Sequence, residues 1–292
     1  MIYQFGCIRG PCSSFADQVA KQAVGALITE VCITPKPGLV DRANSGAHRD
    51  MDIFTFVDSS LALFPYFREI TAYSLTYDGT CDGLLPKLVP RGIQAEQDML
   101  LATGGVNTHK GAIFSLGILC AAVATQAKQR DTAGEAVLQD ACIALAAGRT
   151  RAKTLPVNDV TNGTRIYAQY GLNGVLGEAA AGFPHVFNLA LPRFREQIKR
   201  GNTIETAGVV ALLHLIAHLD DTNIIARCGL EKLREVQAMV SSALAKLSKD
   251  QSDLQYRAYA KELDSMFIQR GISPGGCADL LAATLLIDAL FR

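Results

Sequence analysis

Apolar residues recur at helical spacing in segment after segment of this chain, and this pattern constrains the fold more than any other feature. Val19, Ala23, Leu27 and Val31, for example, repeat every four residues and therefore share one face of a helix. Period-two alternation is rare and β-branched runs are short, which argues against a sheet. No fixed repeat and no linker divides the chain. The sequence therefore predicts an all-α fold, a single compact bundle of roughly ten or more helices that forms one catalytic domain over residues 1–292.

The helical pattern is interrupted at a few places by proline, glycine or polar runs. We expect a kink at Pro65, a break at Pro192, and irregular structure over 78–92 and 149–164, because proline and clustered turn residues disfavour a continuing helix. Ser273 is expected to cap the last helix and Pro274 to occupy its first position. The expected helices cover 15–33, 53–73, a segment starting near 93, 111–127, 132–148, 185–200, 203–219, 229–248, 252–270 and 273–291.

The composition fits a protein with a sizeable core and no preference for polyanions. Hydrophobic residues make up 49% of the 292, and 28 basic side chains balance 28 acidic ones. We therefore expect no nucleic-acid partner, which would require a basic stripe. We also expect no membrane partner, because no apolar run of spanning length and no signal peptide is evident. The eight cysteines contain no C-x-x-C pair, so we expect free thiols in a cytoplasmic protein.

The densest polar stretch is TPKPGLVDRANSGAHRDMD, residues 34–52. Prolines fix φ and glycines reach positive φ, so this stretch is predicted to be a shaped loop. Loops of this kind carry functional groups on a rigid scaffold. The alternative interpretation is a solvated connection between two helices.

Two acidic pairs lie at expected helix ends, Asp50 with Asp52 and Asp220 with Asp221. One or two carboxylates, together with substrate phosphates, are the usual protein ligands of Mg²⁺. These pairs are therefore candidate metal ligands, and helix capping is the structural alternative.

A glycine turn at Gly104–Gly105 leads into Asn107, Thr108, His109 and Lys110 at the start of a helix. Free N–H groups and the positive end of the helix dipole make such a start a natural phosphate site, to which a lysine adds charge. The Walker A spacing is absent, and an ordinary cap with an exposed lysine is the alternative. SPGG, residues 273–276, is a weaker candidate for the same role.

Other side chains are open to both functional and structural interpretations. Glu30, Glu96 and Glu178 border polar stretches and could accept a proton from an attacking hydroxyl, or could be surface glutamates. His214 and His218 share a helix face but lack an H-E-x-x-H motif, so core histidines are favoured over a zinc site.

Five segments of the chain form a recognisable set: 34–52, GGVNTHKGAIFSLG (104–117), GEAAAGFP (177–184), DDTN (220–223) with Arg227, and SPGGCADLLAAT (273–284). In this order they resemble the triphosphoribosyl-dephospho-CoA synthases, which make the prosthetic-group precursor of citrate lyase and, in a sister branch, of malonate decarboxylase. One departure from the family pattern is ARCGLEKL, residues 226–233, where a glycine-richer segment is usual.

This resemblance implies an all-α transferase that joins ATP to 3′-dephospho-CoA. Adenine leaves C1″ of the ATP ribose and the 2′-hydroxyl of dephospho-CoA takes its place, so the reaction is pentosyl transfer. Mg²⁺ is the expected cofactor, and acyl carrier protein transfer machinery is a further expected partner. The sequence does not choose between the citrate lyase and malonate decarboxylase pathways, or between oligomeric states.

The resemblance and the residue chemistry together give a set of predicted site residues. The predicted roles are proton acceptance by Glu30 or Glu178, proton donation to adenine by His48 or His109, stabilisation of positive charge on the ribose by a carboxylate, and charge neutralisation of the triphosphate. The predicted catalytic residues are Glu30, His48, Glu178 and Asp221; the substrate-binding residues are Lys36, Asp41, Asn44, Asn107, Thr108, His109, Lys110, Asn223, Arg227, Ser273, Gly275, Gly276 and Asp279; the metal ligands are Asp50, Asp52, Asp220 and Asp221.

Two other functions fit part of the pattern. A metal-dependent hydrolase of nucleotide or ADP-ribose glycosides would also use acidic pairs in a helical frame, and product analysis separates it from a transferase. A non-enzymatic helical scaffold would show exposed stripes and no polar pocket.

Overall fold

The computed structural model describes residues 12–128, 134–147, 162–250 and 253–292. Within these ranges every regular element is a helix, which confirms the predicted all-α class. The elements are α1 (Cys12–Cys32), α2 (Ile53–Ala62), α3 (Phe64–Thr76), α4 (Cys81–Ala102), α5 (Lys110–Lys128), α6 (Glu135–Ala146), α8 (Asn162–Tyr170), α9 (Val175–Ala180), the π-helix η1 (His185–Ala190), α10 (Leu191–Lys199), α11 (Ile204–His218), α12 (Thr222–Cys228), α13 (Leu230–Asp250), α14 (Asp253–Arg270) and α15 (Gly275–Phe291).

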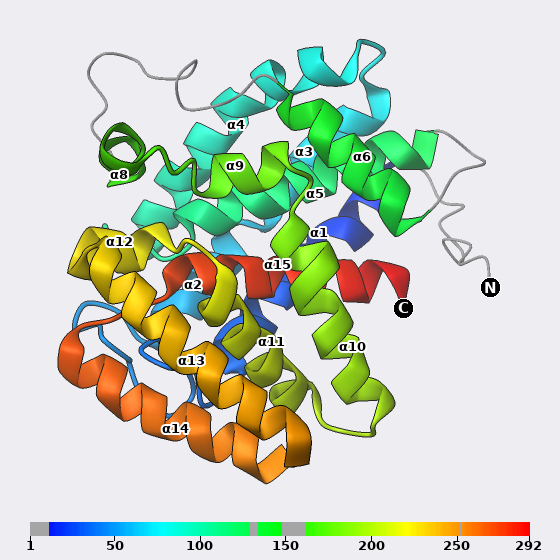
Figure 1. Cartoon of the computed structure of the whole chain (residues 1–292). Helices are drawn as coiled ribbons and strands as arrows, with labels where there is room; N and C mark the ends of the chain where they lie inside the picture. The colour runs from blue at the N-terminus through cyan, green and yellow to red at the C-terminus, as the bar shows by residue number, and fades with distance from the viewer. Residues whose placement is uncertain (1–11, 129–133, 148–161, 251–252) are drawn as a thin grey trace.

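Three helices with almost no polar face, α5, α11 and α15, form the centre of the fold together with α1, whose polar face carries the exposed Lys21 and Gln22. Helix α15 crosses the middle of the molecule, with α13 and α14 on one side and α4, α6 and α9 on the other (Figure 1). It packs against α1, α5 and α11. Helices that are apolar on all sides must be covered on all sides, and the amphipathic α13 covers α11.

Helix α5 is long and apolar enough by composition to cross a membrane, contrary to the expectation that no such run exists. Its residues are instead packed into the protein core, where 72% of the apolar window is buried. Burial of this kind is typical of a central helix, which passes the same compositional test.

Three helix boundaries differ from the sequence-based expectation. Residues 81–92 belong to α4 and are not irregular, although Pro86 and Pro90 lie inside the helix. Leu84 and Leu88 are buried here, and this packing outweighs the two lost backbone donors. Pro65 does not kink a helix but lies in the first turn of α3, after a break at Leu63, where its missing N–H has no helical partner to lose. Of the predicted loop at 149–164, residues 149–161 lie outside the described residues, and residues 162–164 are not a loop but begin α8.

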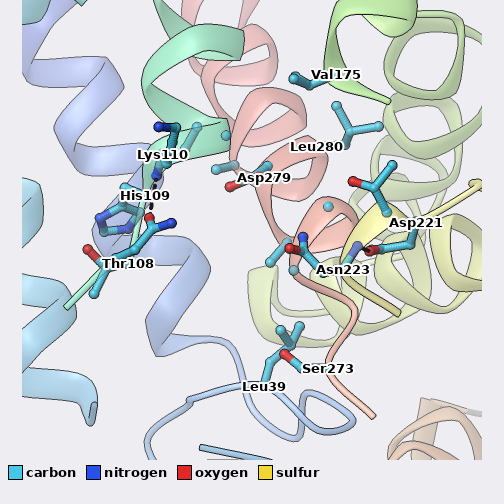
Figure 2. Close-up of a pocket in the computed structure, with 18 of the residues that line it drawn as sticks. Leu39, Thr108, His109, Lys110, Val175, Asp221, Asn223, Ser273, Asp279 and Leu280 are labelled. Atoms are coloured by element: carbon cyan, nitrogen blue, oxygen red, sulfur yellow. Dashed lines mark hydrogen bonds between the residues drawn. The ribbon is translucent and has the colours of Figure 1, made fainter. Parts of the chain in front are cut away.

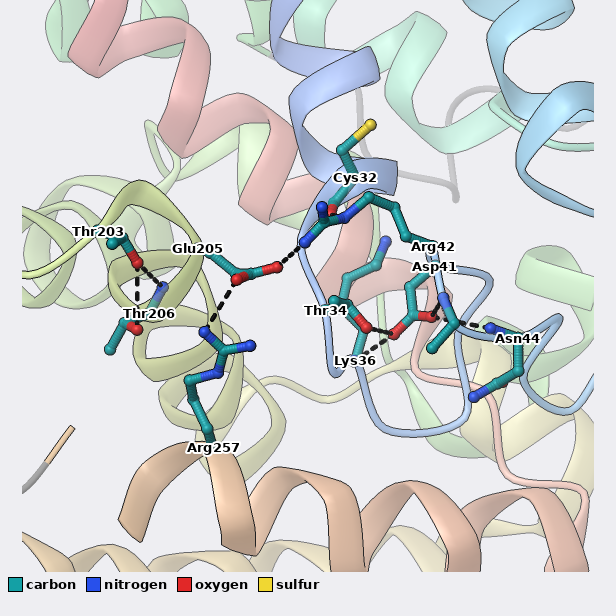
Figure 3. A network of polar contacts seen from close by, with 11 residues as sticks. Cys32, Thr34, Lys36, Asp41, Arg42, Asn44, Thr203, Glu205, Thr206 and Arg257 are labelled. Carbon is teal, nitrogen blue, oxygen red and sulfur yellow. Dashed lines mark hydrogen bonds and ion pairs between the residues drawn. The ribbon is translucent and has the colours of Figure 1, made fainter. Parts of the chain in front are cut away.

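The polar stretch 34–52 is a folded loop held by two carboxylates. Asp41 accepts hydrogen bonds from the Thr34 hydroxyl at 2.6 Å and from the backbone N–H groups of Lys36 and Ala43 at 2.9 and 2.7 Å (Figure 3). Asp264 of α14 accepts from the Gly38 N–H and the Asn44 amide, both at 2.9 Å. The loop is therefore fixed from inside and from a distant helix, and the Thr34–Pro35 bond within it is cis.

An ion-pair network closes the outer side of this loop. Glu205 at the start of α11 pairs with Arg42 of the loop and with Arg257 of α14, the latter at 2.9 Å (Figure 3). Arg42 also donates to the Cys32 carbonyl at 2.6 Å. This network thus ties together the end of α1, the loop, α11 and α14.

Candidate functional site

A cavity of about 710 Å³ opens where the ends of several helices and the 34–52 loop converge. Figure 2 shows Lys110 and Asp279 on one side of it, Asp221 and Asn223 on the other, and Ser273 beside Leu39. This volume falls in the range of small-molecule sites. Of the predicted site residues, the cavity is lined by Glu30, Lys36, His48, Asp50, Asn107, Thr108, His109, Lys110, Glu178, Asp220, Asp221, Asn223, Arg227, Ser273, Gly275, Gly276 and Asp279.

Lys36 and Glu30 form a buried ion pair at the inner wall of the cavity. Glu30 lies in the last turn of α1 and Lys36 in the loop that follows. Burial raises the pKa of the Glu30 carboxyl, and the Lys36 ammonium opposes that rise. A charge held this far from water needs a partner, so each side chain maintains the other in place.

The start of α5 presents polar groups to the cavity, as the glycine turn before it predicts. The Asn107 side chain accepts a hydrogen bond from the Lys110 N–H at 3.2 Å and so caps the helix. Lys110 pairs with Glu96 of α4 at 2.7 Å. The positive end of the helix dipole and a lysine together suit a phosphate group.

His109 is held by a chain of hydroxyl groups that the sequence did not reveal. The Thr108 hydroxyl donates to Ser59 of α2 at 2.6 Å, and Ser59 lies 2.6 Å from Nδ1 of His109. Burial and the nearby Lys36 ammonium lower the pKa of His109 to about 3. The imidazole is therefore neutral at physiological pH, and the prediction that it protonates adenine as an imidazolium does not fit this environment.

Asp221 joins the starts of α12 and α15. It caps α12 by accepting from the N–H groups of Asn223 at 2.8 Å and Ile224 at 3.2 Å. Its other oxygen accepts from the Cys277 N–H of α15 at 2.8 Å. Burial raises the pKa of this carboxyl, although these donors favour its charged form. Asp221 therefore caps a helix, which was the structural alternative, and also lines the cavity.

Asp279 reaches the cavity from the second turn of α15. Burial raises the pKa of its carboxyl well above the usual value, and the neighbouring Asp221 and Glu30 carboxylates raise it further. The carboxyl packs directly on Gly111 of α5, where a Cβ atom would lie 2.9 Å from the Asp279 Cγ atom.

His48, Ser273 and Arg227 form a second polar cluster at the cavity. Ser273 does not cap α15; Pro274 occupies the cap position, and the Ser273 hydroxyl instead lies 2.9 Å from His48 Nε2. An Arg227 nitrogen lies 3.3 Å from His48 Nδ1. Burial lowers the pKa of His48, and the Arg227 guanidinium lowers it further, against the opposing effect of Asp50.

Glu178 lies in the short helix α9, as predicted, and faces His185 at 2.6 Å. The hydrogen bond from His185 to this carboxylate raises the His185 pKa. The other Glu178 oxygen has no hydrogen-bond partner among the described residues. This buried acceptor adds to the polar lining of the cavity.

Three predicted site residues do not line the cavity: Asp41, Asn44 and Asp52. Asp41 is buried within the loop and Asn44 is bonded to Asp264, so both shape the loop. Asp52 is the N-cap of α2, where it accepts from the Thr55 N–H at 3.0 Å. The structural alternative, helix capping, therefore describes Asp52.

The carboxylates of the described residues do not form a complete metal cage, since no group of three or more potential ligands is found there. Asp220 lines the cavity but pairs with Arg234 at 2.6 Å. His214 and His218 do not line the cavity, and His218 Nδ1 lies 2.8 Å from the His214 carbonyl oxygen.

An all-helical fold with a cavity that combines carboxyls, lysines and a helix start is typical of a helical enzyme that acts on phosphorylated substrates. The chain belongs to the family described as "CitG: ATP:dephospho-CoA triphosphoribosyl transferase", whose model matches residues 16–292. It is therefore a triphosphoribosyl-dephospho-CoA synthase, a transferase, and the predicted family and enzyme class are confirmed.

Curated relatives support this assignment along most of the chain. A probable 2-(5''-triphosphoribosyl)-3'-dephosphocoenzyme-A synthase of Vibrio cholerae serotype O1 (strain M66-2) is 44% identical over 280 residues, covering 94% of this chain and 88% of the relative. The synthase of Pectobacterium atrosepticum is 40% identical over 271 residues, covering 92% and 88%, and that of Haemophilus ducreyi is 36% identical over 293 residues, covering 94% and 89%. No solved structure matches the chain.

Proposed function

We propose that the cavity is the active site in which the triphosphoribosyl group of ATP is transferred to 3′-dephospho-CoA. One observation carries this proposal: residues from all five family segments, far apart in the chain, line the same cavity. Lys36, Asp221 and Asp279, for example, come from the loop at 34–52, the start of α12 and α15, and they share its wall.

The cationic and helix-start groups of the cavity suit the triphosphate. Lys36, Lys110 and the positive end of the α5 dipole offset its charge locally, although the protein has no net positive charge. Arg227 and the loop before α15, which contains Ser273, supply further donors at the other end of the cavity. We assign these groups to the phosphates of the two substrates.

Mg²⁺ is proposed to enter with the nucleotide. The described residues offer no group of three ligands, but Mg²⁺ usually needs only one or two carboxylates besides substrate phosphates. Asp50, Asp220 and Asp221 line the cavity and would hold it; Asp52 would not. When bound, the ion neutralises charge on the triphosphate and orients it.

The carboxyls of the cavity are proposed to serve the transfer step. Departure of adenine leaves positive charge on the ribose, which a nearby carboxylate stabilises. A second carboxylate accepts the proton of the attacking 2′-hydroxyl. Neutral His109 is assigned to hydrogen bonding rather than to acid catalysis, because its environment disfavours the protonated ring.

The product is proposed to serve the prosthetic group of citrate lyase or of malonate decarboxylase, as expected for the family. We therefore propose a cytoplasmic location and acyl carrier protein transfer machinery as the downstream partner. The six cysteines whose side chains the structure describes are free thiols, buried or partly buried, and free thiols suit a reducing compartment.

The test is incubation of the protein with ATP, Mg²⁺ and 3′-dephospho-CoA, followed by mass detection of products. Free adenine in equal amount with a triphosphoribosyl-dephospho-CoA supports the proposal. Free ribose triphosphate without the conjugate would instead support glycoside hydrolysis. The variant Asp221→Asn tests the cavity, because full turnover by a folded variant would remove Asp221 from the active site.

A further inference from the structure

Most carboxylates of the cavity already have strong partners. An acid that is paired with a cation or with several N–H donors is a poor proton acceptor, because protonation would forfeit those interactions. The occupied carboxylates and their partners are Glu30 with Lys36, Glu96 with Lys110, Glu178 with His185, Asp220 with Arg234, and Asp221 with the N–H groups of Asn223, Ile224 and Cys277.

Asp279 differs from these acids. It has no ion pair within the described part of the chain, and one backbone N–H group, that of Ala112, lowers its pKa. The groups whose charges act on it are Asp221 before α12 and Glu30 of α1, and Glu30 carries Lys36. Two neighbouring carboxylates and a low-dielectric wall favour proton uptake by Asp279.

Gly111 determines where this carboxyl lies. It belongs to the first turn of α5, and its missing side chain leaves the space that the Asp279 carboxyl occupies. Any other residue at this position would push the carboxyl out of contact with α5. The contact between Gly111 and Asp279 joins α5 and α15 at the point where the start of α5 faces the cavity.

We propose that Asp279 is the catalytic residue that takes the proton of the attacking 2′-hydroxyl, and that Gly111 is the positioning residue that makes room for it. This inference rests on the proposed function, because it requires the cavity to be the active site. It assigns the proton to a different carboxyl from Glu30 and Glu178, the two acids that the sequence suggests for this role.

In the transfer step, the O–H bond of the dephospho-CoA 2′-hydroxyl breaks and the proton moves to Asp279, while the oxygen forms a bond to C1″ of the ribose. The bond from C1″ to adenine breaks, and its electron pair leaves with the base, which takes up a proton from water. Asp279 then returns its proton to water, so that the enzyme is unchanged after one turnover.

The experiment compares Asp279→Asn, Gly111→Ala and a matched control, Gly25→Ala, by steady-state kinetics. Gly25 also lies inside a helix, α1, but an added Cβ there meets nothing within 4 Å. We expect kcat to fall about 10²–10⁴-fold in Asp279→Asn while KM for either substrate changes little. Gly111→Ala should lower kcat about tenfold or more, because the Asp279 carboxyl is still present but displaced. Gly25→Ala should match the wild type.

A pH profile separates a proton acceptor from a residue that only supports the fold. In the wild type, kcat/KM should fall as pH drops below the raised pKa of Asp279, because the active form is deprotonated. The remaining activity of Asp279→Asn should lack this acid limb. Melting curves of all variants establish that each is folded.

The outcomes distinguish the two proposals. If the wild type forms no conjugate, the proposed function fails. If the wild type is active and folded Asp279→Asn keeps its kcat or the acid limb, this inference fails alone. If Asp279→Asn does not fold, Gly111→Ala decides, since full activity there with normal folding overturns the positioning role.

Discussion

The ammonium group of Lys36 contacts the carboxylate of Glu30 inside the protein, with only 1% and 5% of the two side chains exposed. The pair connects the last turn of α1 to the loop at 34–52 and faces the cavity. Because water cannot solvate either charge, the stability of each residue depends on the other.

Removing one member of this pair is expected to be costly. Lys36→Met should lower the free energy of unfolding by about 3–5 kcal/mol, since it leaves Glu30 buried without its cation. The double variant Glu30→Gln/Lys36→Met should recover most of this loss. Urea denaturation of the three proteins measures both quantities, and equal losses in the single and double variants would contradict the coupling.

The buried His109 gives a specific pH dependence. Its pKa is lowered to about 3 in the folded protein, whereas an unfolded histidine has a pKa of about 6.5. The unfolded state therefore binds an extra proton as pH falls from about 6.5 toward about 3, and stability declines by up to about 1.4 kcal/mol per pH unit in that window. Above it, this group contributes no pH dependence.

His109→Gln should flatten the corresponding part of the curve of unfolding free energy against pH. His214, whose pKa burial lowers to about 4, should leave a slope of the same sign over the narrower window from pH about 6.5 to about 4. Proton NMR offers a direct check, because the His109 ring signals should not titrate between pH 5 and pH 8. A midpoint near neutrality would contradict the structure.

Gly38 is expected to tolerate no side chain. Its φ is +68°, and a Cβ atom would clash with the Ile272 carbonyl oxygen and lie 2.9 Å from the Phe267 Cβ atom. Gly38→Ala should therefore destabilise the protein by about 3 kcal/mol or more, from backbone strain plus overpacking. Gly104→Ala is the control, because its φ of +65° is similar but nothing lies within 4 Å, and its cost should be about 1 kcal/mol. Thermal unfolding of both variants measures the difference.

Arg227 is predicted to bind an anionic group of a substrate and to tune His48. Arg227→Ala should raise KM about 10- to 100-fold, as expected when a charged hydrogen bond is lost. It should also raise the pKa of His48, because the guanidinium no longer opposes protonation of the ring. Arg227→Lys retains the charge and should keep the His48 pKa low while losing part of the affinity. Initial rates and histidine NMR provide the two measurements.

Magnesium removal should affect catalysis but not the fold. Mg²⁺ is proposed to enter with the nucleotide, and the described residues hold no three-ligand metal group. A chelator should therefore abolish product formation, with full recovery on adding excess Mg²⁺. The melting temperature without nucleotide should be the same with and without chelator. A chelator-dependent melting temperature of the free protein would point instead to a resident structural metal.

The helical class and the polar segments that could carry function were accessible from the sequence because both depend on local signals. The helical spacing of Val19 and Leu27 and the turn before Asn107 can be recognised from the sequence alone. The remaining candidate residues came from the segments that resemble the family's motifs. What the sequence could not provide was the division between residues that face the cavity and residues that shape its walls.

Asp41 and Asp50 illustrate that limit, since both are acidic residues of one polar loop. Only the folded loop shows that Asp41 is bonded to the backbone around it, while Asp50 lines the cavity. Ser59 and Gly111 were missed because a serine or a glycine inside a helix carries no local signal. Their roles arise from contacts with residues far away in the chain.

Asp264 supports the loop through Gly38 and Asn44, which precede it by 226 and 220 positions. During synthesis, the loop therefore lacks these acceptors until α14 has left the ribosome and docked. The enzyme can gain its shaped catalytic loop only when nearly the whole polypeptide has been made. Premature termination before α14 should consequently yield inactive fragments rather than partly active enzyme.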